Sequence, residues 1–326
     1  MRRREFLGVM GVAAAWPLAG RTQQARVPVI GFLTSLSSAS LAQRAPPVRQ
    51  GLGEIGFVEG RNVMIEYRAA EGQYDRPPSL AAELVGRKVD VILAYGGTGP
   101  AKAAKAATAS IPIVFLSAAD PVGAGIVSSL NRPGGNVTGV SMLGSVLESK
   151  RLGLLNEIVP GTAAIAALVN PKFPDVDLQL RALQDAAGAI KRQVIFLRAS
   201  ADSELVSAFA DAVKLGAGAL LVTQDAFFDD RREQLVALAA QSRLPAIYPL
   251  REFAEMGGLI SYDSDFSDQF RQAGIYLGRI LKGASPADLP VIQPTKFDMV
   301  INLKTARALG LAIPEAFLLR ADVVIE

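Results

Sequence analysis

The 326-residue sequence predicts an α/β fold with two doubly wound, Rossmann-like lobes joined by a multi-segment hinge. Three observations lead to this prediction. Short β-rich runs alternate with amphipathic helical patterns, which is typical of parallel sheets with crossover helices. The alternation restarts after about residue 143, so the chain holds two consecutive sets of β-α units. A further amphipathic helix follows the last strand of the second set, and we expect it to return to the first lobe.

The first lobe is predicted to begin with the apolar run VPVIGFL. A nearly continuous apolar run is expected for a strand that is covered on both faces. The strands are expected at 27–33, 63–67, 89–94, 113–116 and 136–140. The helices are expected before Gly56, over 80–85 and over 100–108.

The second lobe is predicted from residue 144 onward. Its helix over 204–215 spaces Leu205, Phe209 and Val213 so that they share one face, and Asp202 or Ser203 is placed to cap it. The other helices are expected at 147–158, 178–190 and 231–241. The strands are expected at 163–169, 194–197, 219–222 and 246–248.

The returning helix, over 266–281, determines the topology that we expect. It carries an apolar stripe and ends at Gly283 in the C′ position. We expect the chain to cross between the lobes near 140–144, 258–262 and about 282–290. The first lobe would then comprise 27–143 and about 262–285, and the second 144–261 and about 286–326. Lobes joined by such a hinge can close around a ligand. The alternative to this topology is a simple tandem of two domains.

The first 22 residues have the character of an export signal. Three arginines precede an apolar run that is too short to span a bilayer as a helix, which needs about 20 apolar residues. The segment Arg3-Arg4-Glu5-Phe6-Leu7 resembles the twin-arginine export motif. We therefore expect a signal over 1–22, cleavage near Gln23, and a mature protein in the periplasm.

The composition excludes several kinds of chemistry. The sequence has no cysteine and no histidine, which excludes disulfides, thiolate nucleophiles, thiolate metal sites and imidazole acid–base catalysis. Residues 1–22 themselves carry a net charge of +3, equal to the charge of the whole chain, so the remainder is close to neutral. A neutral chain lacks the basic footprint of a nucleic-acid-binding protein. We expect no cofactor, no metal and no nucleic-acid partner.

Candidate binding residues lie where the predicted strands end. In open α/β sheets, ligands bind beyond the carboxyl ends of the strands. In the first lobe these positions are Thr34, Ser35, Tyr95, Gly96, Gly97, Thr98, Ser117 and Asp120. In the second lobe they are Asn170, Gln224, Asp225, Tyr248 and Tyr262.

Each group of candidates suggests a role toward a small zwitterion. Backbone N–H groups over 96–98 could bind a carboxylate, with Pro100 at the first helical position. Asp120 or Asp225 could accept hydrogen bonds from an ammonium group. The tyrosines at 95, 248 and 262 could enclose an apolar or aromatic side chain. Alternatively, residues 96–100 form an ordinary turn, Asp120 is a helix cap, and Phe227 and Phe228 belong to the core or the rim.

The segment DPVGAGIVSSLNRPGGNVTG, over 120–139, resembles a signature stretch of the ABC transporter substrate-binding proteins of the tryptophan or uncharacterised type. Similar matches are LVNP, GLGEIGFVEG, QPTKF and the C-terminal LLRADVVIE, so the resemblance covers essentially the whole chain. It implies a type I periplasmic-binding-protein fold and a non-catalytic role. Such a protein delivers a small solute to a membrane permease. We expect a monomer that binds an amino acid, and amino acids with an aromatic or branched side chain are the first candidates.

An exported enzyme is the other interpretation. Gly97-Thr98-Gly99 begins a nucleotide-binding pattern, but this pattern continues to Lys102 instead of glycine and follows the third strand. A carboxylate-based hydrolase could use Asp120, Asp225 or Asp263, although no pair of carboxylates is fixed by local spacing. Both interpretations are weaker than the binding-protein interpretation.

Overall fold

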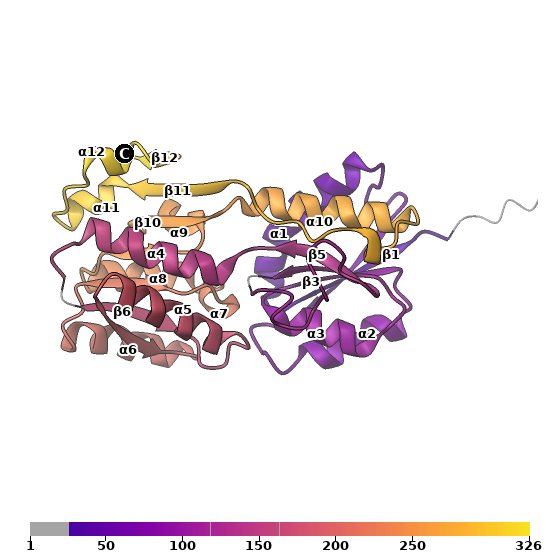
Figure 1. Cartoon of the computed structure of the whole chain (residues 1–326), viewed down its shortest axis with the longest axis horizontal. Helices are drawn as coiled ribbons and strands as arrows, with labels where there is room; N and C mark the ends of the chain where they lie inside the picture. The colour runs from indigo at the N-terminus through magenta and orange to yellow at the C-terminus, as the bar shows by residue number, and fades with distance from the viewer. Residues whose placement is uncertain (1–25, 118, 163) are drawn as a thin grey trace, which may run out of the picture.

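A computed structural model describes residues 26–117, 119–162 and 164–326, and it shows two lobes, each built around one sheet (Figure 1). The predicted export signal over 1–22 lies outside the described residues. Among the described residues, no helix has the length and apolar character needed to cross a membrane.

The first sheet is fully parallel, with the strand order β2-β1-β3-β4-β5. Its strands are β1 (Val29–Thr34), β2 (Met64–Ala69), β3 (Val91–Tyr95), β4 (Ile113–Ser117) and β5 (Val137–Ser141). Its helices are α1 (Ser38–Glu54), α2 (Pro77–Gly86), α3 (Thr98–Ala107) and the returning α10 (Phe266–Leu281). The central strands β3 and β4 are buried along their whole length, which explains why they read as continuous apolar runs.

The second sheet has the order β12-β11-β10-β9-β8-β6-β7 and is parallel except for the β10–β11 pair. Its strands are β6 (Ala164–Val169), β7 (Gln193–Arg198), β8 (Ala219–Val222), β9 (Ala246–Tyr248), β10 (Ile260–Ser264), β11 (Phe297–Asn302) and β12 (Val323–Ile325). Its helices are α4 (Gly144–Ile158), α5 (Val176–Ala189), α6 (Asp202–Lys214), α7 (Ala226–Asp229), α8 (Arg232–Gln241), α9 (Arg251–Glu255), α11 (Leu303–Ala308) and α12 (Glu315–Leu318). The two predicted sets of β-α units are therefore present.

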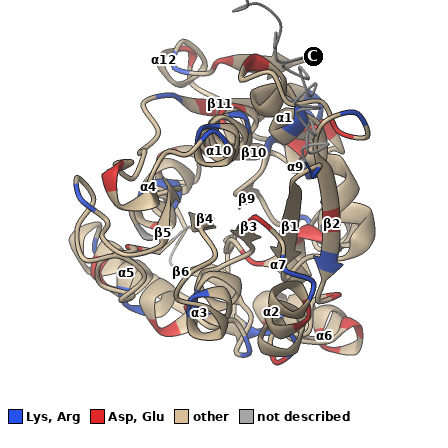
Figure 2. Cartoon of the chain, turned by 90° about the vertical axis from the view of Figure 1, so that its right-hand side faces the viewer, with Lys and Arg blue, Asp and Glu red and all other residues tan. Residues whose placement is uncertain are grey.

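Helix α10 returns to the first lobe, as the sequence predicts. It packs along α1 on one side of the first sheet, whereas α2 and α3 cover the other side (Figure 2). Two glycines permit this close helix pair. A Cβ atom on Gly51 would lie 1.9 Å from the carbonyl oxygen of Arg271, and one on Gly274 would lie 2.2 Å from that of Val48.

Two of the expected crossings lie elsewhere. Residues 260–264 form strand β10, which pairs with β9 and β11, so the second crossing occurs at Asp265 and not over 258–262. Residues 286–292 stay with the first lobe, because Ile292 accepts a hydrogen bond from Ser141 and donates one to Gly139. The third crossing is therefore 293–296 instead of 282–290. Both predictions failed because neither the short strand β10 nor the connection over 286–292 has a periodic sequence pattern that identifies it.

One predicted cap is also wrong. Helix α6 begins at Asp202, and its N-cap residue is Ala201, which provides no side-chain hydrogen bond. Asp202 and Ser203 lie inside the first turn, where Asp202 still interacts favourably with the helix dipole.

Candidate ligand-binding site

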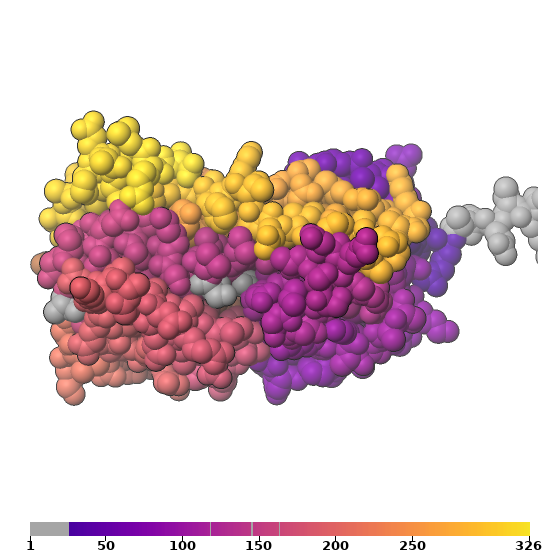
Figure 3. Space-filling model, in the orientation of Figure 1, coloured from indigo at the N-terminus to yellow at the C-terminus, as the bar shows by residue number. Residues whose placement is uncertain are grey.

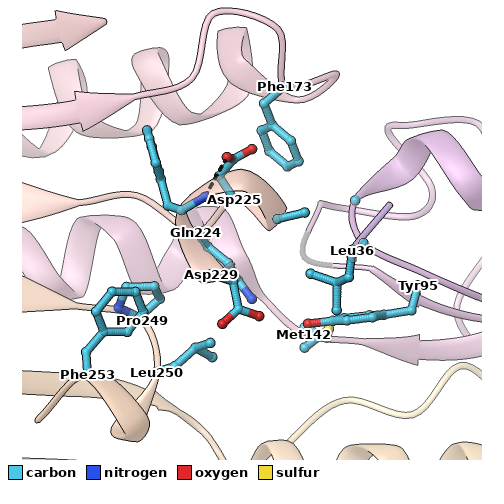
Figure 4. A pocket seen from close by; sticks show the side chains of 14 residues that line it. Leu36, Tyr95, Met142, Phe173, Gln224, Asp225, Asp229, Pro249, Leu250 and Phe253 are labelled. Atoms are coloured by element: carbon cyan, nitrogen blue, oxygen red, sulfur yellow. Dashed lines mark hydrogen bonds between the residues drawn. The ribbon is translucent and has the colours of Figure 1, made fainter. Parts of the chain in front are cut away.

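A pocket lies between the lobes, at the carboxyl ends of strands from both sheets (Figure 4). Its volume in this arrangement is about 30 Å³, so the surrounding side chains nearly fill it. The lining residues are Leu36, Tyr95, Gly96, Gly97, Met142, Phe173, Gln224, Asp225, Ala226, Phe228, Asp229, Pro249, Leu250 and Phe253.

The wall from the first lobe is mainly apolar. The Tyr95 ring lies edge-on against Phe270, with 4.8 Å between the ring centroids. Burial raises the pKa of Tyr95, so its hydroxyl group stays neutral. Leu36 and Met142 lie beside this ring and face Asp229 and Leu250 across the pocket (Figure 4).

Gly97 lets the second lobe approach the first. Its φ of 91° lies in the region that favours glycine, and a Cβ atom there would lie 2.8 Å from the ring of Phe173. A side chain at this position would require the Phe173 ring to move and would strain the backbone. This close approach explains the Gly96-Gly97 turn better than an ordinary strand-to-helix connection would.

Thr98 receives a carboxylate, as the sequence suggests, but this carboxylate belongs to the protein. Asp175 of the second lobe accepts hydrogen bonds from the Thr98 N–H at 3.0 Å and from the Thr98 hydroxyl at 2.6 Å. The donors of Thr98 are therefore occupied in this arrangement. Helix α3 begins at Thr98, so Pro100 is its third residue and not its first.

Asp225 lies on the pocket wall with all of its carboxylate oxygens engaged. Its Oδ1 accepts from Asn170 Nδ2 at 3.1 Å and from the N–H groups of Phe227 and Phe228, and it thereby caps α7. The hydroxyl of Tyr74 donates to its Oδ2 from the first lobe. Burial raises the pKa of Asp225 to about 6, even though these donors stabilise the ionised form.

Arg44 forms a buried ionic link between the lobes. Its guanidinium lies 3.1 Å from Asp229 Oδ2 and 2.7 Å from Glu252 Oε1, and only 8% of the arginine side chain is exposed. Asp229 also pairs with Arg232. Burial raises the pKa of Asp229, and the two arginines oppose that effect.

Asp230 adds another contact between the lobes. It accepts hydrogen bonds from the Ser37 N–H at 3.0 Å, from the Ser37 hydroxyl at 2.8 Å and from the Ser40 hydroxyl. Together with the contacts of Thr98, Tyr74 and Arg44, these bonds define a closed arrangement, in which the space-filling view shows the lobes in contact (Figure 3).

Three predicted site residues lie away from the pocket. Tyr248 stacks on Phe253 at 4.8 Å inside the second lobe, and Tyr262 stacks on Phe297 at 6.1 Å. Asp120 is exposed and accepts a hydrogen bond from the Val122 N–H at 3.0 Å, so it caps a turn. A strand-end position does not reveal which face of the sheet its side chain occupies, and for this reason the tyrosines were misplaced.

The remaining predicted residues do not line the pocket, apart from Gly96 and Gln224. Thr34 accepts a hydrogen bond from the Leu36 N–H at 3.1 Å. Ser35 and Ser117 are buried, and within the described part of the chain their hydroxyl groups have no hydrogen-bond partner. Asn170 positions Asp225.

The sequence analysis missed most of the apolar lining. Leu36, Met142, Phe173, Pro249 and Leu250 are spread over loops and crossings without a recognisable pattern. Phe227 and Phe228 belong to the core of the second lobe, as expected, and Phe228 also lines the pocket. These lining residues could have been predicted only from the expectation that the pocket lies between two lobes.

Comparisons with known proteins agree with this architecture. A family model described as ABC transporter substrate binding protein matches residues 28–325. The chain is 28% identical to a tyrosine-binding protein of Clostridioides difficile (strain R20291) over 292 residues, which cover 89% of this chain and 83% of the relative. This family consists of binding proteins and not of enzymes, so both enzyme interpretations are set aside.

Two solved structures bear on the closed arrangement. An ABC domain from Streptococcus pneumoniae in complex with L-Trp matches with a TM-score of 0.81 and 29% identity, covering 91% of this chain and 99% of that chain. A ligand-free, open substrate-binding protein from Clostridium difficile matches with a TM-score of 0.66 and 26% identity, covering 92% and 99%. At similar identity, this chain superposes better on the ligand complex than on the open form.

Proposed function

The chain belongs to the ABC transporter substrate-binding protein family, and we propose that it captures an amino acid between its two lobes and delivers it to a permease. The observation that carries this proposal is the interlobe pocket, because its lining comes from both lobes. Relatives described as tyrosine-binding and as an L-Trp complex support an amino-acid ligand.

The pocket lining favours an aromatic or branched apolar side chain. Tyr95, Phe173 and Phe253 supply aromatic surfaces, and Leu36 and Leu250 supply aliphatic ones. Aromatic surfaces contribute large buried areas and edge or stacking contacts to a bound ring. A sugar would instead require many polar side chains around its hydroxyl groups.

Ligand entry requires the lobes to separate, because the side chains that line the pocket nearly fill it in this arrangement. The three crossings allow the lobes to rotate as rigid bodies about a common hinge. Small-angle scattering of the ligand-free protein should give a larger radius of gyration than scattering of the protein with saturating ligand. An unchanged radius at saturation would contradict closure.

Mass spectrometry of small molecules released from the denatured protein tests the ligand class. Thermal-shift assays with single amino acids, sugars, anions and nucleotides then check the candidate. A ligand at 100 times its dissociation constant should stabilise the fold by about 2.7 kcal/mol. If a sugar, anion or nucleotide shifts the melting temperature and no amino acid does, the assignment is wrong.

We also propose that the protein works in the periplasm as a monomer. The Arg-rich, apolar N-terminal sequence supports export. An inner-membrane permease of the ABC type would be the partner that receives the ligand.

A further inference from the structure

A smaller cavity adjoins the interlobe pocket. Its volume is about 20 Å³. A single water needs about 10–15 Å³ by this measure, so the cavity accommodates one group of that size, such as an ammonium. Phe173 and Gln224 line both cavities, and a single ligand could therefore occupy both.

Unpartnered hydrogen-bond acceptors lie around this cavity. Glu148 Oε2, Gln179 Oε1 and Gln224 Oε1 are buried and have no hydrogen-bond partner within the described part of the chain. Glu148 is fully buried, and Gln179 is 6% exposed. Buried polar atoms usually find a partner, because an unmade hydrogen bond is costly. A ligand group that only donates hydrogen bonds fits a cavity lined by such acceptors.

The protein holds these side chains in place. Glu148 Oε1 accepts a hydrogen bond from the Gln224 N–H at 2.9 Å and one from Gln179 Nε2 at 3.4 Å. Gln179 Nε2 also donates to the carbonyl oxygen of Gln224 at 2.7 Å. Arg151 Nη1 lies 3.4 Å from Glu148 Oε2 and balances its charge, while the other guanidinium nitrogens bind Tyr262 O and Asp263.

The other buried acidic side chains around the cleft already have partners. Thr98 donates to Asp175, and Arg44 pairs with Asp229. Asp225 accepts hydrogen bonds through both of its oxygens. Glu148 differs from them because its Oε2 is held only by the ion pair with Arg151 Nη1 at 3.4 Å and accepts no shorter hydrogen bond among the described residues.

We propose that Glu148, together with the side-chain oxygens of Gln179 and Gln224, receives the α-ammonium group of the ligand, whose side chain lies in the adjoining pocket. This assignment rests on the proposed amino-acid ligand and replaces Asp120 and Asp225 in that role.

Glu148→Gln tests the assignment, because it removes the charge and keeps the shape. Calorimetry would compare L-tryptophan with indole-3-propionate, which lacks the ammonium group, and L-tyrosine with 3-(4-hydroxyphenyl)propionate. The variant should bind the amino acid about 10- to 100-fold more weakly, the range expected for a hydrogen bond to a charged group. Its affinity for the analogue without the ammonium group should stay within about threefold of wild type. Asp120→Asn is the matched control and should bind all four compounds like wild type.

The possible results separate this assignment from the proposed function. If wild type binds an amino acid and Glu148→Gln binds it equally well, the ammonium assignment is overturned and the function stands. If wild type binds no amino acid, both are overturned. If Glu148→Gln does not fold, as judged by circular dichroism, Gln179→Met provides the second test. It should weaken amino-acid binding more than binding of the analogue, and an equal effect on both would overturn the assignment.

Discussion

Replacing Arg44 with methionine should shift the protein toward its open form. In the closed arrangement, Arg44 pairs with Asp229 and Glu252 of the second lobe. Removing one partner of a buried ion pair costs about 3–5 kcal/mol. Asp229 keeps its pair with Arg232, and Glu252 is 30% exposed and can be hydrated. We therefore expect the lower end of that range.

This cost falls on the closed form alone, because Arg44 belongs to the first lobe and both acidic groups belong to the second. A loss of about 3 kcal/mol corresponds to roughly a 100-fold change in the equilibrium between closed and open forms. The apparent affinity for ligand should weaken by up to that factor, since binding requires closure. Titration calorimetry measures the affinity, and small-angle scattering measures how much ligand is needed to reach the compact form.

Arg49→Met is the control on the same helix. Arg49 pairs with Glu59 inside the first lobe, and 46% of its side chain is exposed. Such a surface pair contributes at most about 1 kcal/mol, so ligand affinity should change by less than about fivefold. Equal affinities for wild type and Arg44→Met would refute the claim that this ion pair stabilises the closed form.

Three further predictions concern pH, packing and export. Burial raises the pKa of Asp225 to about 6 from 3.8, so the folded chain holds this proton more tightly than the unfolded chain. The Asp225 carboxyl should therefore lower the free energy of unfolding by up to about 3 kcal/mol as the pH rises from about 4 to 6. In urea unfolding, the free energy of unfolding of Asp225→Asn should therefore fall less than that of wild type between pH 4 and 6. If the two proteins lose the same free energy over this interval, the raised pKa of Asp225 is contradicted. Gly51→Ala should lower the free energy of unfolding by about 1–3 kcal/mol, because the new methyl group would overlap α10. Gly53→Ala, with nothing within 4 Å, should be neutral or stabilising in the same assay. Replacing Arg3 and Arg4 with lysine should abolish periplasmic accumulation, and unchanged fractionation would indicate the general secretory route.

Much of the fold could be predicted because its central strands are buried on both faces. Strands such as β3 and β6 are fully buried and read as apolar runs of the right length. Strand β10 was missed because it is short and follows two glycines, and its sequence fits a connection equally well. Only its pairing with β9 and β11 identifies it as a strand.

The site could be predicted in position but not in detail. The rule about strand ends correctly placed Tyr95, Gly97 and Gln224 on the pocket wall. It could not show that Asp175 occupies the donors of Thr98, because these residues lie 77 positions apart and meet only when the lobes close. The rule could not point to Glu148, which we propose for the ammonium group, because it lies inside helix α4 and not directly after a strand in the sequence.

A crystal structure of the protein with L-tyrosine or L-tryptophan tests the central claim most directly. We predict that the lobes are closed, with the aromatic ring against Tyr95 and Phe173 and the ammonium nitrogen within hydrogen-bond distance of Glu148. An amino acid bound outside the interlobe pocket, or an empty pocket between closed lobes at saturating ligand, would contradict the account.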